Sequence, residues 1–237
     1  MSRREHLASL TIPPYFLPSP PMRLDEDTIA AFERLFIAST GGGQIERVEY
    51  TLSVPKWQFL CYLCEQKGIV LHGSGDLNLD TLEPRKATDV IDFGNREAVY
   101  AAADGIWPIF FAIVNRDLPV RSLVNSCAWV VEPTGGRAGP YYFFSIDAAD
   151  HLGSPWREGT VYLLPGETFE RQAPQPYRGM TIEATQAASP VGVRPLAKLA
   201  VGPADFPFLD QVRRHDPAVM RTRASADPDG FPWLDEV

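Results

Sequence analysis

Two short apolar runs, separated by a polar loop, constrain the fold of this chain more than any other feature of its sequence. The first, Ile69–Leu71, delivers His72 into a Gly-Ser turn, and the second, Ala98–Ala101, carries Tyr100. Both runs are bounded by Gly, Asp and Asn and are shorter than a typical helix, which favours β-strands. The sequence therefore predicts two strands, one ending with the imidazole of His72 and the other carrying the phenol ring of Tyr100.

Three segments have helical periodicity. The first predicted helix follows Asp25 and ends at Gly41-Gly42-Gly43, and the second begins at Pro55 and ends at Gly68. The third covers Asp104–Val114. Apolar stripes identify their buried faces: Ile29, Phe32, Leu35 and Phe36 in the first, and Trp57, Leu60, Cys61 and Cys64 in the second. Pro108 is tolerable in the third helix only near its start.

The remaining short runs indicate strands. We expect them at Val48–Leu52, Ile69–His72, Ala98–Ala101, Ala128–Glu132, Tyr141–Ile146, Thr160–Leu164, Thr181–Ala184 and Leu196–Val201. Helices and strands mix in the first part of the chain, and strands dominate the second. This order predicts an α+β fold rather than alternating βαβ units.

Composition bounds the classes of function. A chain of 237 residues that is 45% hydrophobic can bury a sizeable core. The net charge of −8 disfavours nucleic acid as a partner, because an acidic chain repels phosphate backbones. Three cysteines fit a reducing compartment. We expect a cytoplasmic protein without a membrane segment, since the longest uncharged apolar run, Gly105–Asn115, is too short to cross a bilayer.

Both ends of the chain are rich in proline and aromatic residues. The lead of residues 1–24 is expected to be extended and held on the body of the protein by Tyr15 and Phe16. Beyond Pro203 the chain becomes polar, and we expect Phe231-Pro232-Trp233-Leu234 to form a packed tail. His151 and His215 have no spaced partner and are predicted to be surface residues.

The two strand-borne motifs, His72-Gly73-Ser74 and Tyr100-Ala101-Ala102, resemble elements of the ADP-ribosyltransferase superfamily. The branch that they resemble includes diphtheria toxin and the poly(ADP-ribose) polymerases. The resemblance covers roughly residues 55–205. It implies two small antiparallel or mixed sheets at an angle, with NAD in the cleft between them. Residues 1–54 would then be a helical N-terminal extension, and residues 206–237 a C-terminal tail.

The resemblance also implies a role for each motif residue. His72 would hydrogen-bond a ribose hydroxyl, the backbone of Gly73 would pair with the nicotinamide carboxamide, and Tyr100 would stack on the nicotinamide ring. Ser74 would add a polar contact. Arg85, in the loop after the first motif, either reaches the pyrophosphate of NAD or is a solvated loop residue. The alternative interpretation is structural: a strand-ending turn at His72 and a half-buried strand residue at Tyr100.

Active members of the family carry a glutamate on a later strand, where it stabilises the oxocarbenium-like transition state. Its position falls shortly before Ser189, where the sequence offers Gln186 and no acid. Glu183 is the nearest substitute, but on a single strand it would point to the face opposite Gln186. The sequence therefore leaves open whether an acid serves this site.

Three functions remain in view. The first is an NAD-dependent transferase of ADP-ribose, or an NAD glycohydrolase, that needs no metal and whose acceptor is a protein side chain or small molecule rather than nucleic acid. The second is a catalytically inactive ligand-sensing or interaction module. The third, an RNA 2′-phosphotransferase-like enzyme, would need a basic groove. Cys61-Tyr62-Leu63-Cys64 lacks the second pair that a zinc site requires and is predicted to pack.

Overall fold

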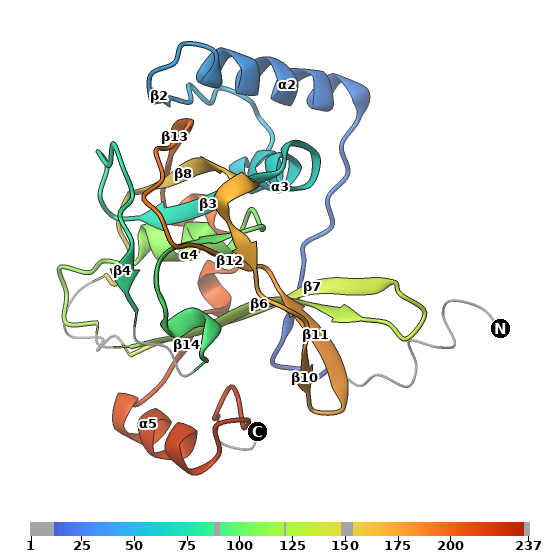
Figure 1. The fold of residues 1–237 in the computed structure, drawn as a ribbon, viewed down its shortest axis with the longest axis vertical. Coiled ribbons are helices and arrows are strands. Elements are labelled where there is room, and N and C mark those ends of the chain that lie inside the picture. Colours follow the sequence, from blue (N-terminus) through green and yellow to red (C-terminus); the bar gives the residue numbers. More distant parts are fainter. Residues whose placement is uncertain (1–11, 88–90, 121, 148–153, 235–237) are drawn as a thin grey trace.

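The strands of this chain gather in two sheets, with four α-helices among the residues that the structure describes (Figure 1). The computed structural model describes residues 12–87, 91–120, 122–147 and 154–234. The predicted α+β class is confirmed, and both sheets are largely antiparallel. None of the helices described is long and apolar enough to cross a bilayer.

The first sheet has six strands in the order β1-β7-β6-β11-β10, with β14 beside β7. They are β1 (Leu17–Pro18), β6 (Leu123–Val131), β7 (Arg137–Ile146), β10 (Gln175–Tyr177), β11 (Met180–Ala184) and β14 (Arg213–Arg214). Its centre is the long hairpin of β6 and β7. The register of this hairpin shifts between Ala128 and Val130, so that Gly139 and Pro140 of β7 lie opposite the single residue Trp129 of β6, which is a β-bulge on β7.

The second sheet has eight strands in the order β2-β13-β8-β3-β5-β12-β9, with β4 beside β5. They are β2 (Glu46–Arg47), β3 (Ile69–Ser74), β4 (Arg85–Lys86), β5 (Glu97–Ala102), β8 (Gly159–Pro165), β9 (Glu170–Arg171), β12 (Gln186–Ser189) and β13 (Ala197–Val201). Strand β3 pairs with β8 along its whole length, but its ladder with β5 is a single pair, Leu71 opposite Ala102.

The helices begin and end where local chemistry requires. They are α2 (Glu26–Thr40), α3 (Lys56–Lys67), α4 (Trp107–Ile113) and α5 (Pro217–Ala226), and short 3₁₀ turns lie at Phe93–Asn95, Gly166–Thr168, Pro203–Asp205 and Leu209–Gln211. The Asp25 carboxylate accepts the Thr28 N–H at 2.8 Å and caps α2. Gly68, with φ of +65°, ends α3 in the left-handed conformation that favours glycine. Pro108 lies in the first turn of α4.

Helix α4 rests directly on the backbone of the second sheet. A Cβ added to Gly73 of β3 would lie 1.8 Å from the carbonyl oxygen of Pro108, and one added to Gly159 of β8 would lie 2.0 Å from that of Ala112. Only glycine permits such close approach of a helix to a strand. The glycine of the His-Gly-Ser motif therefore has a structural role in seating α4.

One hydrophobic core draws side chains from α3, α4 and both sheets. Leu60, Ile109, Phe144 and Leu163 are fully buried members of it. Full burial of each such side chain contributes about 1.5–3 kcal/mol. The N-terminal extension supplies Phe32 and Val48 to the core, and the C-terminal segment supplies Phe206 and Phe208. The three parts of the chain distinguished in the sequence thus share one core.

The two aromatic ends of the chain pack on each other. Phe16 stacks on Phe231, with ring centroids 6.3 Å apart, and both rings contact Phe143 of β7. The Tyr177 hydroxyl donates to the Phe231 carbonyl oxygen at 2.8 Å. The expectations of a lead held by aromatic side chains and of a packed tail are confirmed for the residues described, which exclude 1–11 and 235–237.

Several boundaries differ from the sequence prediction. Val48–Leu52 is not a strand: the Val48 N–H still bonds to Lys198, but Tyr50 N–H bonds back to the Val48 carbonyl, so the chain turns away from the sheet. The sequence analysis did not predict β12, whose small residues Ala187 and Ala188 give no strand pattern. It also missed α5, which is capped by Asp216.

Candidate functional site

His72 and Tyr100 lie on neighbouring strands of the second sheet. The Nδ1 atom of His72 is 2.7 Å from the carbonyl oxygen of Tyr100. Because a carbonyl oxygen only accepts, Nδ1 carries the proton and the tautomer of a neutral His72 is fixed. The Nε2 atom has no hydrogen-bond partner among the residues described and is a free acceptor when the ring is neutral.

The imidazole of His72 lies in a partly buried environment that favours its neutral form. His72 faces Tyr162 of β8, whose hydroxyl accepts from the Leu79 N–H at 3.0 Å and donates to the Asp76 carbonyl oxygen at 2.8 Å. Burial lowers the pKa of His72 below its ordinary value, the bond to Tyr100 acts in the opposite sense, and the positive charge of Arg85 lowers it further.

Tyr100 is held by the turn that precedes its own strand. Its hydroxyl accepts the Arg96 N–H at 2.8 Å and donates to the Phe93 carbonyl oxygen at 3.0 Å. Its ring packs against a small cluster that includes Phe93 and Ala188. Side chains alternate along a strand, so Tyr100 and the residue opposite His72, Ala101, point to opposite faces. The two motif side chains therefore flank the β3–β5 junction from different faces.

The neighbouring residues of the predicted site have simple environments. The Ser74 Oγ accepts the Asp76 N–H at 3.0 Å, which is the geometry of a turn. Arg85 is exposed on β4, opposite Ala98 of β5, close enough for its charge to affect His72. Together with Gly73, these residues remain near His72, on the strand and loop that follow it.

The two residues considered for the missing glutamate lie in different sheets. Glu183 lies on β11, opposite Trp129, whereas Gln186 lies on β12, opposite Ala102. The chain crosses between the sheets at Thr185, whose N–H bonds to Cys127 and whose carbonyl accepts from Ala103. Glu183 lies within the strand predicted at Thr181–Ala184, and Gln186 lies on a separate strand, so the single strand that the face argument assumed does not form. The residue opposite Tyr100 on β12 is Ala188.

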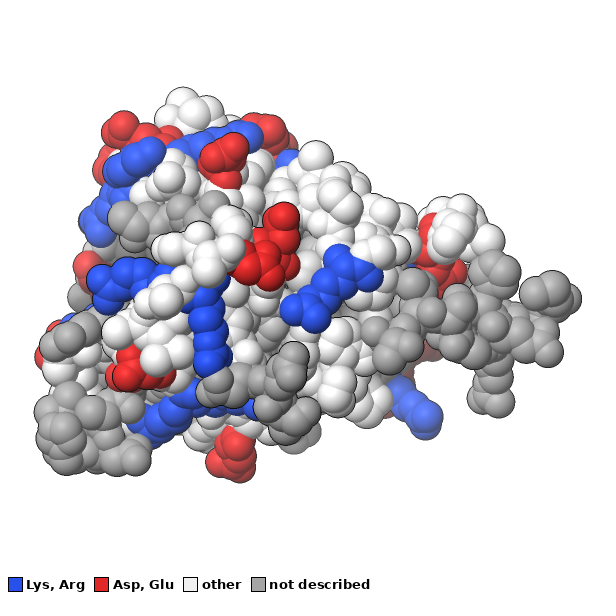
Figure 2. Space-filling view, turned by 90° about the horizontal axis from the view of Figure 1, so that it is seen from below, with Lys and Arg blue, Asp and Glu red and all other residues white. Residues whose placement is uncertain are grey.

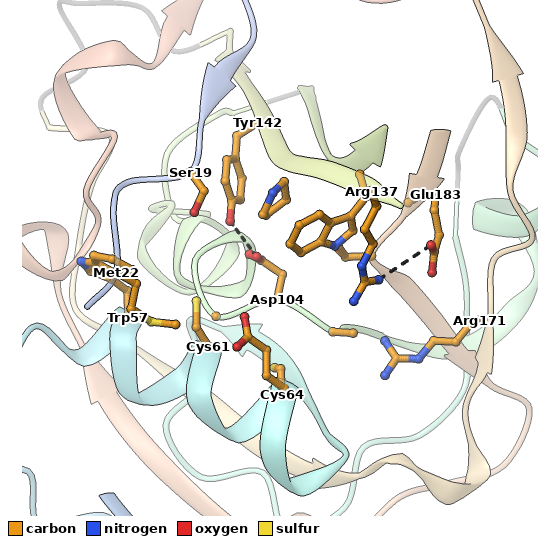
Figure 3. Close-up of a pocket in the computed structure, with 17 residues that line it drawn as sticks. Ser19, Met22, Trp57, Cys61, Cys64, Asp104, Arg137, Tyr142, Arg171 and Glu183 are labelled. Carbon is orange, nitrogen blue, oxygen red and sulfur yellow. Dashed lines mark hydrogen bonds and ion pairs between the residues drawn. The ribbon is translucent and has the colours of Figure 1, made fainter. Parts of the chain in front are cut away.

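A cavity of about 310 Å³ opens where the two sheets meet α3 (Figure 3). It is lined by Ser19, Met22, Trp57, Cys61, Cys64, Glu65, Ala103, Asp104, Gly105, Trp129, Arg137, Pro140, Tyr142, Arg171, Glu183, Ala184 and Thr185. Among the residues predicted from the sequence to form the site, only Glu183 lines it. Its volume is at the lower end of the range of small-molecule pockets.

The cavity has a charged end. Arg137 Nη1 lies 3.8 Å from Glu183 Oε2, and the Arg137 guanidinium lies 4.5 Å from the centre of the Trp129 ring. Burial lowers the pKa of Arg171, whose guanidinium points into the cavity (Figure 3). Glu65 is exposed beside Cys64, and burial raises the pKa of its carboxyl.

Asp104 is a fully enclosed carboxyl group in the cavity wall. Its Oδ1 accepts the N–H groups of Ile106 and Trp107 at 2.9 and 2.7 Å, and its Oδ2 accepts the Tyr142 hydroxyl at 2.7 Å. Burial raises the pKa of Asp104, and these donors act against that effect. Because both oxygens are occupied, Asp104 positions the start of α4 and the Tyr142 ring rather than offering a free carboxylate.

Cys61 and Cys64 lie on the face of α3 that borders the cavity. Burial raises the pKa of both thiols well above the ordinary value, so they remain protonated and unreactive at neutral pH. No group of three or more His, Cys, Asp or Glu side chains within the described part of the chain is arranged to hold a metal ion.

His215 and the charged residues of the cavity were not recognised from the sequence as functional candidates. His215 is partly buried, and its two ring nitrogens lie 2.7 and 2.8 Å from the Ser122 and Ser145 hydroxyls. His151 lies outside the described residues. Arg137 lies before the strand predicted at Tyr141–Ile146, whereas the structure places it at the start of β7. Asp104 carried one usable signal, since an aspartate just before an apolar helix is a typical N-terminal cap.

Comparisons with known proteins identify no relative. No family model matches the chain, and no curated protein or solved structure matches it at a significant level.

Proposed function

We propose that this chain is an NAD-binding protein of the ADP-ribosyltransferase type, in which NAD lies across the place where the β3–β5 ladder ends. His72, Ser74 and the Gly73 backbone would hold the ribose and carboxamide from one side, and Tyr100 would contact the nicotinamide ring from the other. The observation that carries the proposal is the strand order β8-β3-β5-β12. It brings the strands of His72, Tyr100 and Gln186 side by side, although they are far apart in the sequence. The ladder between β3 and β5 is a single residue pair, and next to it the hydrogen bond from the His72 imidazole to the Tyr100 carbonyl oxygen joins the two motifs.

The chemistry of His72 also supports binding of a ribose. Its neutral ring, with the proton on Nδ1, presents Nε2 as an acceptor for a hydroxyl donor. Arg85 lies near enough to influence His72 and supplies a positive charge for a pyrophosphate. No metal is needed for either contact.

Binding without transfer is the form of this function that the geometry favours. The neighbour of β5 carries Gln186, which offers no charge, and Glu183 lies in the other sheet beside Arg137. A transferase stabilises a developing cation, and loss of one such electrostatic partner costs about 3–4 kcal/mol in the transition state. The catalytically inactive, ligand-sensing form of the family is therefore our first choice, and NAD cleavage is the alternative.

The charge distribution favours NAD binding or NAD cleavage over the RNA 2′-phosphotransferase alternative, which would need a basic groove. On the face shown in Figure 2, Lys and Arg side chains are interspersed with Asp and Glu. The net charge of the chain is −8. If NAD is cleaved, a protein side chain or small molecule is accordingly a better acceptor than nucleic acid.

Thermal unfolding with and without NAD tests the proposal. Ligand at about 100 times its dissociation constant stabilises the wild type by about 2.7 kcal/mol. His72→Ala is expected to abolish this shift, whereas His215→Ala, a matched change at a partly buried histidine elsewhere, retains it. Release of nicotinamide by the wild type would select the transferase or glycohydrolase. Absence of any shift at about 10 mM NAD, far above useful affinities, would remove the NAD proposal.

A further inference from the structure

The cavity between the sheets has one apolar end and one charged end, and the proposed NAD site uses neither. Figure 3 shows Met22 and Trp57 at one end and Arg137, Glu183 and Arg171 at the other. One end is therefore apolar, and the other carries two guanidinium groups and the Glu183 carboxylate, with Glu65 close enough for the charge of Arg137 to act on its carboxyl. This is the pattern of a pocket in which an apolar wall holds the body of a ligand and a few polar groups fix its head.

The Arg171 guanidinium borders this cavity without a direct charge partner among the described residues. No described residue forms a hydrogen bond or ion pair with its side chain, and the carboxylate whose charge affects its pKa is that of Glu183. Of the nearby carboxylates, Glu183 is directed to Arg137 at 3.8 Å, and in Glu65 burial raises the pKa while the charge of Arg137 acts against that rise. Arg171 is exposed to solvent, so its five guanidinium N–H donors are available to an oxyanion that enters the cavity.

The other acids near the cavity do not fill this role. Both oxygens of Asp104 are taken by Ile106, Trp107 and Tyr142. Glu65 lies on α3 and forms no hydrogen bond or ion pair with any described residue. Neither therefore neutralises Arg171 through contact.

We propose that this cavity binds a small organic acid, with its carboxylate or phosphate held by Arg171 and Arg137 and its apolar body against Met22 and Trp57. The volume of about 310 Å³ suits a molecule the size of an aromatic acid. Arg137 is preset for this role because Trp129 supports its guanidinium plane from behind at 4.5 Å. The ligand replaces the long Arg137–Glu183 contact with a closer, charge-assisted one. This inference is independent of the proposed NAD site.

Isothermal titration of the full chain with matched probes tests the cavity. The probes are 4-phenylbutyrate, phenyl phosphate and the neutral 4-phenylbutyramide. We expect at least one acid to bind with a dissociation constant below about 1 mM and the amide to bind at least about tenfold more weakly. The two acids distinguish a carboxylate ligand from a phosphate ligand. Equal binding of acid and amide, or no binding of either acid below about 10 mM, would overturn the proposal.

Variants locate the binding. Arg171→Gln is expected to weaken the acid about tenfold or more, while Arg47→Gln, a matched change at an exposed arginine of β2, leaves it unchanged. Arg137→Lys provides a second, milder change at the same end of the cavity. Unchanged affinity in both cavity variants would contradict the assignment. His72→Ala leaves this cavity intact, so it retains acid binding even where it loses NAD binding, and the two proposals fail separately.

Discussion

The Nδ1 atom of His72 lies 2.7 Å from the carbonyl oxygen of Tyr100, so a side chain rather than a peptide N–H joins β3 and β5 at their motif ends. His72 thus has a structural bond and, by our proposal, a ligand-binding atom on the same ring. A loss of NAD binding in His72→Ala could therefore result from loss of the bond to Tyr100 or from loss of the ligand-binding Nε2 atom. A variant that keeps one of these atoms and lacks the other distinguishes the two.

His72→Asn separates them. The amide nitrogen of asparagine is as many bonds from the backbone as Nδ1, so it can donate to the Tyr100 carbonyl, but the variant has no atom in the place of Nε2. We expect His72→Ala to cost about 1 kcal/mol of unfolding free energy and His72→Asn to recover part of it. Only the wild type should bind NAD. These values come from urea unfolding, and NAD binding by His72→Asn would show that Nε2 is not the ligand atom.

The same histidine predicts a pH dependence of stability. Its pKa in the folded state is lowered from 6.5, mainly by burial, so the unfolded state binds the proton more readily. The stability contributed by its neutral form is complete above pH 6.5 and is lost as the pH falls through the lowered pKa. His72→Asn should therefore flatten the fall in stability below pH 6.5. Burial lowers the pKa of His215 in the same direction, so part of the slope remains.

Sequence periodicity and punctuation predicted the elements that surround these histidines. Asp25, Gly68 and Pro108 each act locally, through capping, a left-handed turn and a fixed φ, so α2, α3 and α4 could be predicted from single residues. Strand β12 could not, because its alanines gain strand character only from pairing with β5. The crossing at Thr185, which separates Glu183 from Gln186, likewise depends on partners distant in sequence.

The candidate site was predictable in part for the same reason. His72 and Tyr100 belong to short apolar runs that predict two strands, a pattern visible in the chain, but the pairing of these two strands is not visible there. The cavity depends on Arg137, Arg171 and Asp104, which come from three separate segments and meet only in the folded protein. Nothing in their local sequence marks the two arginines.

Gly73→Ala tests the structural role of the motif glycine. The added Cβ would lie 1.8 Å from the Pro108 carbonyl oxygen, so α4 must move away from β3. We expect a loss of about 3 kcal/mol in urea unfolding, at the upper end of overpacking costs. Ser74→Ala, which removes only the turn bond to Asp76, is the control and should cost less than about 1 kcal/mol. Wild-type stability in Gly73→Ala would show that α4 does not rest on this strand.

Tyr142→Phe tests the buried contact of Asp104. The change removes the 2.7 Å bond to Oδ2 and leaves that oxygen without its hydroxyl donor, which should cost about 1–3 kcal/mol. Tyr141→Phe is a matched control on the same strand, because its partly exposed hydroxyl makes no hydrogen bond with the described residues. Equal unfolding free energies for the two variants would contradict the importance of this bond.

Phe231→Ala tests whether the C-terminal tail holds the N-terminal lead in place. Phe231 contacts Phe16, Phe143 and Trp233, and its carbonyl accepts the Tyr177 hydroxyl. Removing the partly buried ring should cost about 2 kcal/mol. Because Phe16 loses its stacking partner, amide exchange at Leu17 and Ser19 should accelerate together with that of the tail. Ile37→Ala, at a side chain that is 64% exposed on α2, should change neither quantity. Faster exchange in the tail alone would show that the lead is held by Phe143 without it.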